Sequence, residues 1–375
     1  MQNDPICTIS GGHGTGGPWA SGAARADETS GANHAPKLNA TAPSAPRFKL
    51  RPALPFFRRM TAVAPKVAET FQEDLWFGDE DPLRCERDAK ASLAAAVGAA
   101  VGLKPFPTVA THAMRLLSDP DVDFKAVERV VEQDPALTTQ LLRTANAAVF
   151  ATSHAADRVH EAVMRLGSRQ VYNLVAGLAA MGMFRDLRGL GAYVRDHCAG
   201  VAGIARTLAE SWGLSGGTPE LFLSALLHDI GKLLSLQVGE IAYHRFGREV
   251  LASPDAVHVE ERAAVGYDHA VLGAHVLSAW EMPDTVVDVV ALHHQPGRAF
   301  ARSAEIGLSV ALIRLANRID YRLQRNEPAD DAFLETLGQS VESTYTDLDV
   351  TQLTALWPQL VAARREVAGV FTGRR

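Results

Sequence analysis

The spacing of apolar residues changes at Pro105, and from there almost to the end of the chain they recur at intervals of three and four. This spacing places them along one face of an α-helix, whereas a half-buried strand would alternate at every second residue. Asp123 and Asp134 stand where a side chain can cap a following helix, and Pro135 suits a first helical position. No two strand-like runs flank a hairpin turn. We therefore predict an all-α fold, a multi-helix bundle.

One long run shows how small residues divide the helical pattern. Apolar periodicity extends from Val159 to Met183 but is interrupted at Gly167. We expect Gly167 to end one helix and Ser168 to cap the next. Amphipathic segments at residues 331–345 and 350–370 predict further helices, which would cover the core or form a dimer surface.

The residues before Pro105 have a different composition. Residues 1–46 are dominated by Gly, Ala, Ser, Thr, Pro and Asn without a helical or strand period, so we predict a disordered N-terminal region. Residues 47–103 form a predicted linker that contains a basic segment (Arg47–Met60), an acidic patch (Glu73–Asp81) and a helix (Arg84–Val101). We interpret the basic segment as solvated chain; docking on a partner or an anionic membrane surface is the alternative.

Composition limits the partners and the compartment. Of the 375 residues, 47% are hydrophobic and 21% charged, so the chain can bury a sizeable core. The formal net charge of -6 argues against nucleic acid as a partner, because duplex binding needs many clustered Lys and Arg contacts. Three cysteines without a CxxC pair favour a reducing compartment, and we expect a cytoplasmic protein. Neither a signal peptide nor a transmembrane segment is predicted.

The second half of the chain concentrates histidine and aspartate in a helical context. Imidazole and carboxylate together suit divalent transition metals. A metal bound in this way lowers the pKa of its water and generates a nucleophile for phosphate esters. The candidate residues are His197, His228, Asp229, His269, His293, His294 and Asp320.

The segment LLHDIGK, residues 226–232, is the most specific of these signals. The pattern predicts that His228 and Asp229 arrive at the end of a helix, and that Gly231 takes the positive φ that ends it. Lys232 follows and could neutralise a phosphate oxygen. The segment resembles the signature of the HD superfamily of metal-dependent phosphohydrolases.

Three further segments resemble the HDOD domains, a branch of that superfamily. They are VVEQDPALTTQLLRTANAAVF from Val130, EAVMRLGSRQVYNLVAGLA from Glu161, and YDHAVLGAHVLSAWEMPDTVVDVVALHH from Tyr267. The resemblance extends over residues 104–321, which we take as the domain, with a C-terminal helical extension at 322–375. It implies an output or scaffold module of bacterial signal transduction, in a family that has mostly lost the HD catalytic set.

The resemblance also implies a metal-ligand set. His197 matches the first ligand, and His228 with Asp229 matches the doublet. His269 and one of His293 or His294 match the histidines that serve a second metal in dinuclear relatives. The metal would be Fe, Mn, Zn or Ni.

The last ligand of the set departs from the family pattern. Asn317 stands where the closing motif has an aspartate, and an amide oxygen is a poorer ligand than a carboxylate. Asp320 could replace it only if the helix rotates. The GYP segment of the branch that hydrolyses cyclic-di-GMP is also missing after His294, so that activity is poorly supported.

Each candidate also has a simpler structural interpretation. His197, His228 and Asp229 would then form a polar cluster whose members hydrogen-bond one another and hold helices in register. The other three histidines would lie at the surface or at helix ends. Lys232 would be a C-terminal helix residue that favours the helix dipole, and Cys198 a small core residue.

Three hypotheses about function follow. The first is a noncatalytic adaptor that binds signalling proteins, as a monomer or an oligomer. The second is a metal-dependent phosphohydrolase acting on a nucleotide or phosphoester, with Asp229 in the metal site and Lys232 steering phosphate. The third is a pocket that binds a nucleotide without turnover, so that its occupancy biases a helix arrangement. Whether the chain is an enzyme at all therefore stays open at this point.

Overall fold

The computed structural model describes residues 87–103, 105–147, 150, 155–211, 220–246, 251, 253 and 255–372. All of these residues belong to one compact unit. The predicted disordered region (1–46), the basic segment and the acidic patch lie outside the described residues.

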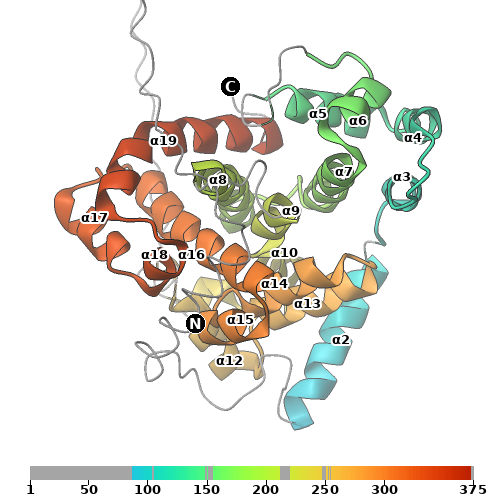
Figure 1. The fold of residues 1–375 in the computed structure, drawn as a ribbon. Helices are drawn as coiled ribbons and strands as arrows, with labels where there is room; N and C mark the ends of the chain where they lie inside the picture. The colour runs from blue at the N-terminus through green and yellow to red at the C-terminus, as the bar shows by residue number, and fades with distance from the viewer. Residues whose placement is uncertain are drawn as a thin grey trace, which may run out of the picture. The chain divides into compact units, whose positions relative to one another are not determined.

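The described residues form helices and contain no strand, as predicted (Figure 1). The helices are α2 (Arg87–Leu103), α3 (Thr108–Leu117), α4 (Phe124–Val131), α5 (Pro135–Ala145), α6 (Val159–Leu166), α7 (Ser168–Gly182), α8 (Leu190–Ser211), α9 (Leu221–Leu227), α10 (Ile230–Val238), the short 3-10 helix η2 (Tyr243–Arg245), α12 (Val257–Val265), α13 (His269–Ala279), α14 (Asp284–Leu292), α15 (Pro296–Arg302), α16 (Ala304–Gln324), α17 (Asp331–Gly338), α18 (Val341–Thr346) and α19 (Val350–Thr372).

The predicted aspartate caps are confirmed. The Asp123 carboxylate accepts the backbone N–H of Lys125 at the start of α4, and the Asp134 carboxylate accepts two N–H groups at the start of α5. Pro135 occupies the first position of α5, where its missing N–H leaves no intrahelical bond unmade.

The predicted cap at Ser168 is wrong. Gly167 lies between α6 and α7 with φ of 82°, so it both ends α6 and occupies the N-cap position of α7. Ser168 is already the first residue of α7, and no side chain caps this helix. The positive φ of Gly167 supplies the turn, which leaves Ser168 inside the helix.

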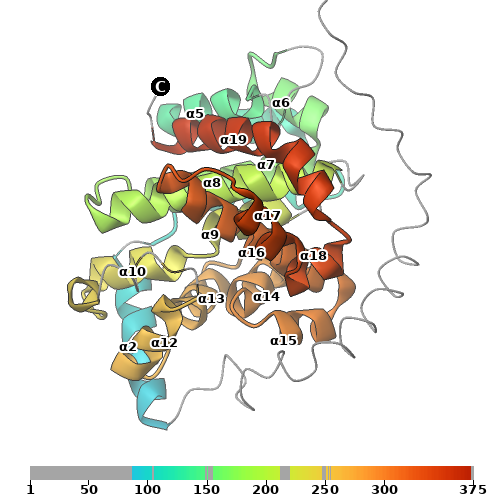
Figure 2. The same ribbon diagram turned by 90° about the vertical axis from the view of Figure 1, so that its left-hand side faces the viewer.

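The long helix α8 lies at the centre of the packing. It contacts α9 and α16, and α19 packs along it, as both views show (Figures 1 and 2). The helices approach closely because α8 presents a glycine. A Cβ on Gly203 would lie 2.7 Å from the backbone oxygen of Ala363 in α19.

The prediction that Gly231 takes a positive φ is wrong, and the reason matters for the site. Helix α9 ends at Leu227 and α10 begins at Ile230, so Gly231 lies within the first turn of α10. Its φ is not positive. A Cβ on Gly231 would lie 1.9 Å from the backbone oxygen of His269. The glycine therefore permits close packing of α10 against the start of α13.

The segment Leu221–Val238, which comprises α9 and α10, has the length and apolar composition of a membrane span. In this fold 83% of the segment is buried. A core helix of a folded domain passes the same test of composition, and the His228-Asp229 doublet lies at its centre.

Candidate metal centre

Four helix ends or turns bring the candidate ligands together. His228 directly follows α9 and Asp229 directly precedes α10, while His269 is the first residue of α13 and His293 directly follows α14. His197 reaches the same place from the middle of α8, and His294 follows His293 directly. The six side chains are at most 4% exposed, so the surface part of the simpler interpretation is wrong, whereas His269 and His293 do lie at helix ends.

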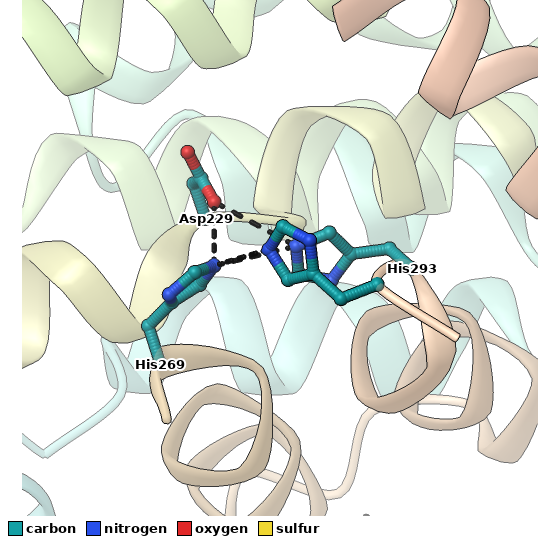
Figure 3. Close-up of side chains that lie close together, drawn as sticks. Asp229, His269 and His293 are labelled. Atoms are coloured by element: carbon teal, nitrogen blue, oxygen red, sulfur yellow. Dashed lines mark hydrogen bonds and ion pairs between the residues drawn. The ribbon is translucent and has the colours of Figure 1, made fainter. Parts of the chain in front are cut away.

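The Asp229 carboxylate lies between two groups of imidazoles. Its Oδ1 is 3.0 Å from His269 Nε2 and 3.7 Å from His293 Nε2, an arrangement seen in Figure 3. Its Oδ2 is 3.8 Å from His197 Nε2 and 3.6 Å from His228 Nε2. One carboxylate thus faces four ring nitrogens, two on each oxygen.

Backbone carbonyls set the orientation of two of these rings. His228 Nδ1 donates to the carbonyl oxygen of Ala225 at 2.8 Å, and His293 Nδ1 donates to that of Val290 at 2.7 Å. Since a carbonyl oxygen can only accept, the proton of each neutral ring is on Nδ1. Each Nε2 consequently carries a lone pair on the side of the ring that faces Asp229.

Carboxylates orient the other two rings. His269 Nδ1 lies 2.5 Å from Glu261 Oε2, and His197 Nδ1 lies 2.7 Å from Asp320 Oδ2. In metal sites a ligating histidine commonly donates its second ring N–H to a carboxylate or a backbone carbonyl, which fixes the ring and raises its basicity. His197, His228, His269 and His293 all have such a partner.

The donor atoms left over fit a metal ion. The Nε2 atoms of His197 and His228 are buried without a hydrogen-bond partner. His269 Nε2 lies 3.0 Å from His294 Nε2 and 3.3 Å from His293 Nε2, so ring nitrogens converge there. Burying an unpaired polar atom destabilises a fold, and divalent cations would satisfy these nitrogens.

The described residues form two such donor groups that share one member. Within each group one ligand atom per residue lies within 4.8 Å of the others. The groups are His197, His228 and Asp229, and Asp229, His269, His293 and His294.

Burial keeps several of the rings neutral. It lowers the pKa of His228 to about 4 and holds the pKa values of His293 and His294 well below the usual value. Burial would also lower the pKa of His269, but the carboxylates of Glu261 and Asp229 raise it to about 9. Among His228, His269, His293 and His294, a metal would therefore displace a proton only from His269 at neutral pH.

Lys232 belongs to the cluster. Its Nζ lies 2.7 Å from Asp229 Oδ2, and the side chain is buried. Burial would lower the pKa of the Lys232 ammonium, but Asp229 raises it above its ordinary value. Burial would raise the pKa of Asp229, but Lys232 and the neighbouring histidines hold it well below its usual range. Lys232 lies in the first turn of α10, so its interpretation as a C-terminal helix residue is wrong.

Asp320 reaches the cluster without helix rotation, although outside both donor groups. Its Oδ2 accepts from His197 Nδ1, which makes it an orienting carboxylate. Asn317, one turn earlier on α16, is buried and its Oδ1 has no hydrogen-bond partner. Its place among the metal ligands stays a prediction.

Sequence reasoning missed several partners of the site. Glu261 of α12 accepts both the Nδ1–H and the backbone N–H of His269, and the Tyr243 hydroxyl donates to its second oxygen. The His258 ring stacks on His294, with centroids 4.1 Å apart and planes 16° apart. Glu261 and His258 have no motif of their own, so only the packing of α12 against α13 reveals their roles.

A small cavity opens on one side of the cluster. Its volume is about 20 Å³, and His197, Asp229, Lys232 and Tyr321 contribute to its wall. That is room for about one water molecule, whereas pockets for small organic ligands measure roughly 300–1,000 Å³. The nucleotide pocket stays a prediction, and the described residues leave no space of that size at this point.

Comparisons with known proteins agree with this architecture. The family model for the HDOD domain matches residues 103–296. An uncharacterised protein of Treponema pallidum (strain Nichols) is 23% identical over 188 residues, which are 50% of this chain and 37% of the relative. The match thus spans little more than a third of that relative.

Several solved structures have a similar fold. A protein of Shewanella amazonensis SB2B, provisionally named a phosphohydrolase, has a TM-score of 0.55 and 22% identity, covering 74% of this chain and 98% of its own. A second protein of that organism, provisionally named a metal-dependent phosphohydrolase, has a TM-score of 0.54 and 18% identity, covering 76% and 100%. An HDOD domain protein of unknown function from Geobacter sulfurreducens has a TM-score of 0.52 and 20% identity, covering 75% and 99%. At these identities the likeness shows the fold.

Proposed function

The chain belongs to the HDOD family, and on this premise we propose that it is a signalling output module that binds divalent metal in its core and acts through protein contacts. Its partners would be other signalling proteins of the cytoplasm. The metal centre would hold helices α8, α9, α13 and α14 in one arrangement that a partner recognises.

The metal-binding part rests on one observation. Four imidazoles are held through Nδ1 by a carbonyl or carboxylate, and their Nε2 atoms all face Asp229. A polar cluster kept only for stability would pair its buried atoms with one another. Here the Nε2 atoms of His197 and His228 have no hydrogen-bond partner, which favours a cation between them and Asp229.

Three features favour a role without turnover. The cavity beside the cluster has room for about one water, which is too little for a phosphoester. Lys232 is committed to Asp229, so its ammonium is not free to receive a phosphate. Asn317 replaces the carboxylate that the catalytic relatives use.

A metal-dependent phosphohydrolase is the second candidate, because the cavity reaches the cluster at His197, Asp229 and Lys232. Two proteins of the same fold are provisionally named for that activity. A bound divalent ion would supply a water of lowered pKa as the nucleophile. Lys232 would have to exchange Asp229 for a phosphate oxygen, and the wall at Tyr321 would have to open.

The decisive experiment measures bound metal. The full chain is purified without chelator, and Fe, Mn, Zn and Ni are quantified by elemental analysis in the wild type, in His228→Ala with Asp229→Ala, and in His275→Ala. His275 is an exposed histidine of α13 and serves as the matched control. We expect stoichiometric metal in the wild type and the control, and none in the double variant. A folded wild type that stays empty when Mn and Fe are supplied would refute metal binding.

A turnover assay separates the two candidates. The metal-loaded wild type is offered phosphomonoesters, phosphodiesters and cyclic dinucleotides, with the double variant as the blank. The output-module proposal predicts no release of phosphate above the blank. Release that is lost in the double variant would establish the phosphohydrolase instead.

A further inference from the structure

The C-terminal helix α19 reaches the metal centre through two hydrogen bonds in series. Arg364 Nε donates to Asp320 Oδ1 at 2.9 Å, and the other oxygen of Asp320 receives His197 Nδ1 at 2.7 Å. The guanidinium also donates to Asp196, one residue before His197. A residue of α19 thus holds the carboxylate that orients a candidate ligand.

This contact differs from an ordinary surface ion pair. Asp320 is fully buried, and the Arg364 side chain is 16% exposed. Ion pairs between exposed groups are weak and easily exchanged, whereas a buried carboxylate depends on each of its donors. Asp320 has two donors in the described part of the chain, the ring of His197 and the guanidinium of Arg364.

Helix α8 is shaped to admit this contact. A Cβ on Gly200 would lie 2.1 Å from Asp320 Oδ1 and 3.1 Å from the Cγ of Arg364. One turn further, a Cβ on Gly203 would lie 2.7 Å from the backbone oxygen of Ala363. Both glycines leave room where α19 and the Asp320 carboxylate meet α8. The geometry of the two hydrogen bonds that link Arg364, Asp320 and His197 therefore depends on how closely α19 packs against α8.

We infer that α19 is a positioning element of the metal centre, in which Arg364 acts through Asp320 to fix the ring of His197. This inference rests on the proposed metal binding and adds an element outside residues 103–296, the part that matches the family model. Because coupling between two sites is reciprocal, docking of α19 strengthens metal binding, and metal binding strengthens the docking of α19. A partner that displaces α19 would then loosen the ion.

The test compares full-length variants of two neighbouring arginines. Arg364→Gln removes the charge and the paired donors, Arg364→Lys keeps the charge, and Arg365→Gln is the matched control because Arg365 is exposed on the same helix. Co(II) affinity is measured by competition with a chelator, and the visible spectrum of bound Co(II) reports ligand geometry.

We expect Arg364→Gln to bind Co(II) about 10- to 100-fold more weakly, the loss typical of a residue that orients a metal ligand, with a changed spectrum. Arg364→Lys should recover part of the Co(II) affinity and part of the wild-type spectrum, and Arg365→Gln should match the wild type in both measurements. Unchanged affinity and spectrum in Arg364→Gln would overturn the inference and leave the proposed metal binding intact. A wild type that binds no Co(II) would overturn both.

A second measurement needs no variant and covers the case in which Arg364→Gln does not fold. Amide hydrogen exchange across residues 350–372 is followed in the wild type with and without Co(II). Slower exchange of α19 in the presence of metal is the expected result. Equal exchange in both samples, with Co(II) bound, would overturn the coupling.

Discussion

Replacing Gly231 by alanine tests whether the packing of α10 against α13 builds the site. The added Cβ would lie 1.9 Å from the backbone oxygen of His269, 2.6 Å from its carbonyl carbon and 2.8 Å from its Cα. All three are backbone atoms, so no side-chain rotation relieves the clash. The two helices must separate, and His269 must move away from Asp229.

The magnitude follows from two opposing terms. Glycine in a helix interior costs about 0.5–1 kcal/mol relative to alanine, so the substitution alone would stabilise α10. Overpacking a well-filled core costs about 1–3 kcal/mol, and a clash with backbone belongs at the upper end. We expect a net loss of about 2 kcal/mol in the free energy of unfolding.

Gly98 provides the control, because a Cβ added there in α2 meets nothing within 4 Å. Urea denaturation of wild type, Gly231→Ala and Gly98→Ala should give opposite signs, with Gly98→Ala stabilised by about 0.5–1 kcal/mol. Metal content should fall only in Gly231→Ala. If both glycine variants gain stability equally, the close approach of α10 and α13 is not a feature of the folded protein.

Three shorter predictions concern other elements. Asp134→Ala removes the cap of α5 and should lower the free energy of unfolding by about 1 kcal/mol in urea titrations, and an unchanged value would contradict the cap. Burial would raise the pKa of Glu342, but Arg314 and Arg318 hold it below 4.5. The stabilising effect of the Glu342 carboxylate is therefore fully present above pH 4.5 and is lost as the pH falls through the lower pKa that the group has in the folded protein. The difference in stability between wild type and Glu342→Gln should shrink across that window, and a difference independent of pH would refute this. Asn317→Asp should raise divalent-metal affinity in a chelator competition, because carboxylate is the stronger ligand, and equal or lower affinity would remove Asn317 from the ligand set.

Local signals in the sequence predicted what depends on neighbouring residues. The helical period and the caps at Asp123 and Asp134 involve contacts within one turn, so they could be inferred without the fold. The His228-Asp229 doublet could also be predicted, because the motif itself includes the break between α9 and α10.

Contacts between distant segments could not be predicted. Gly231 suggested a helix end, but its real constraint is the backbone of His269, 38 positions later in the chain. Glu261 and Arg364 stand in segments without any motif, and their roles appear only when α12 and α19 are packed. The surface alternative for His269 failed for the same reason, since its burial depends on the packing of α10, α12 and α14 against α13.

The depth of the donor group formed by Asp229, His269, His293 and His294 has a kinetic consequence. These side chains are at most 4% exposed, and Asp229 lies in an apolar segment that is 83% buried. Ions exchange at such a place only when the surrounding helices open, which is as rare as the local stability is high. The identity of the metal bound there would then depend on the ions that were available while the chain was folding. Ions that the folded protein encounters later would replace it only slowly.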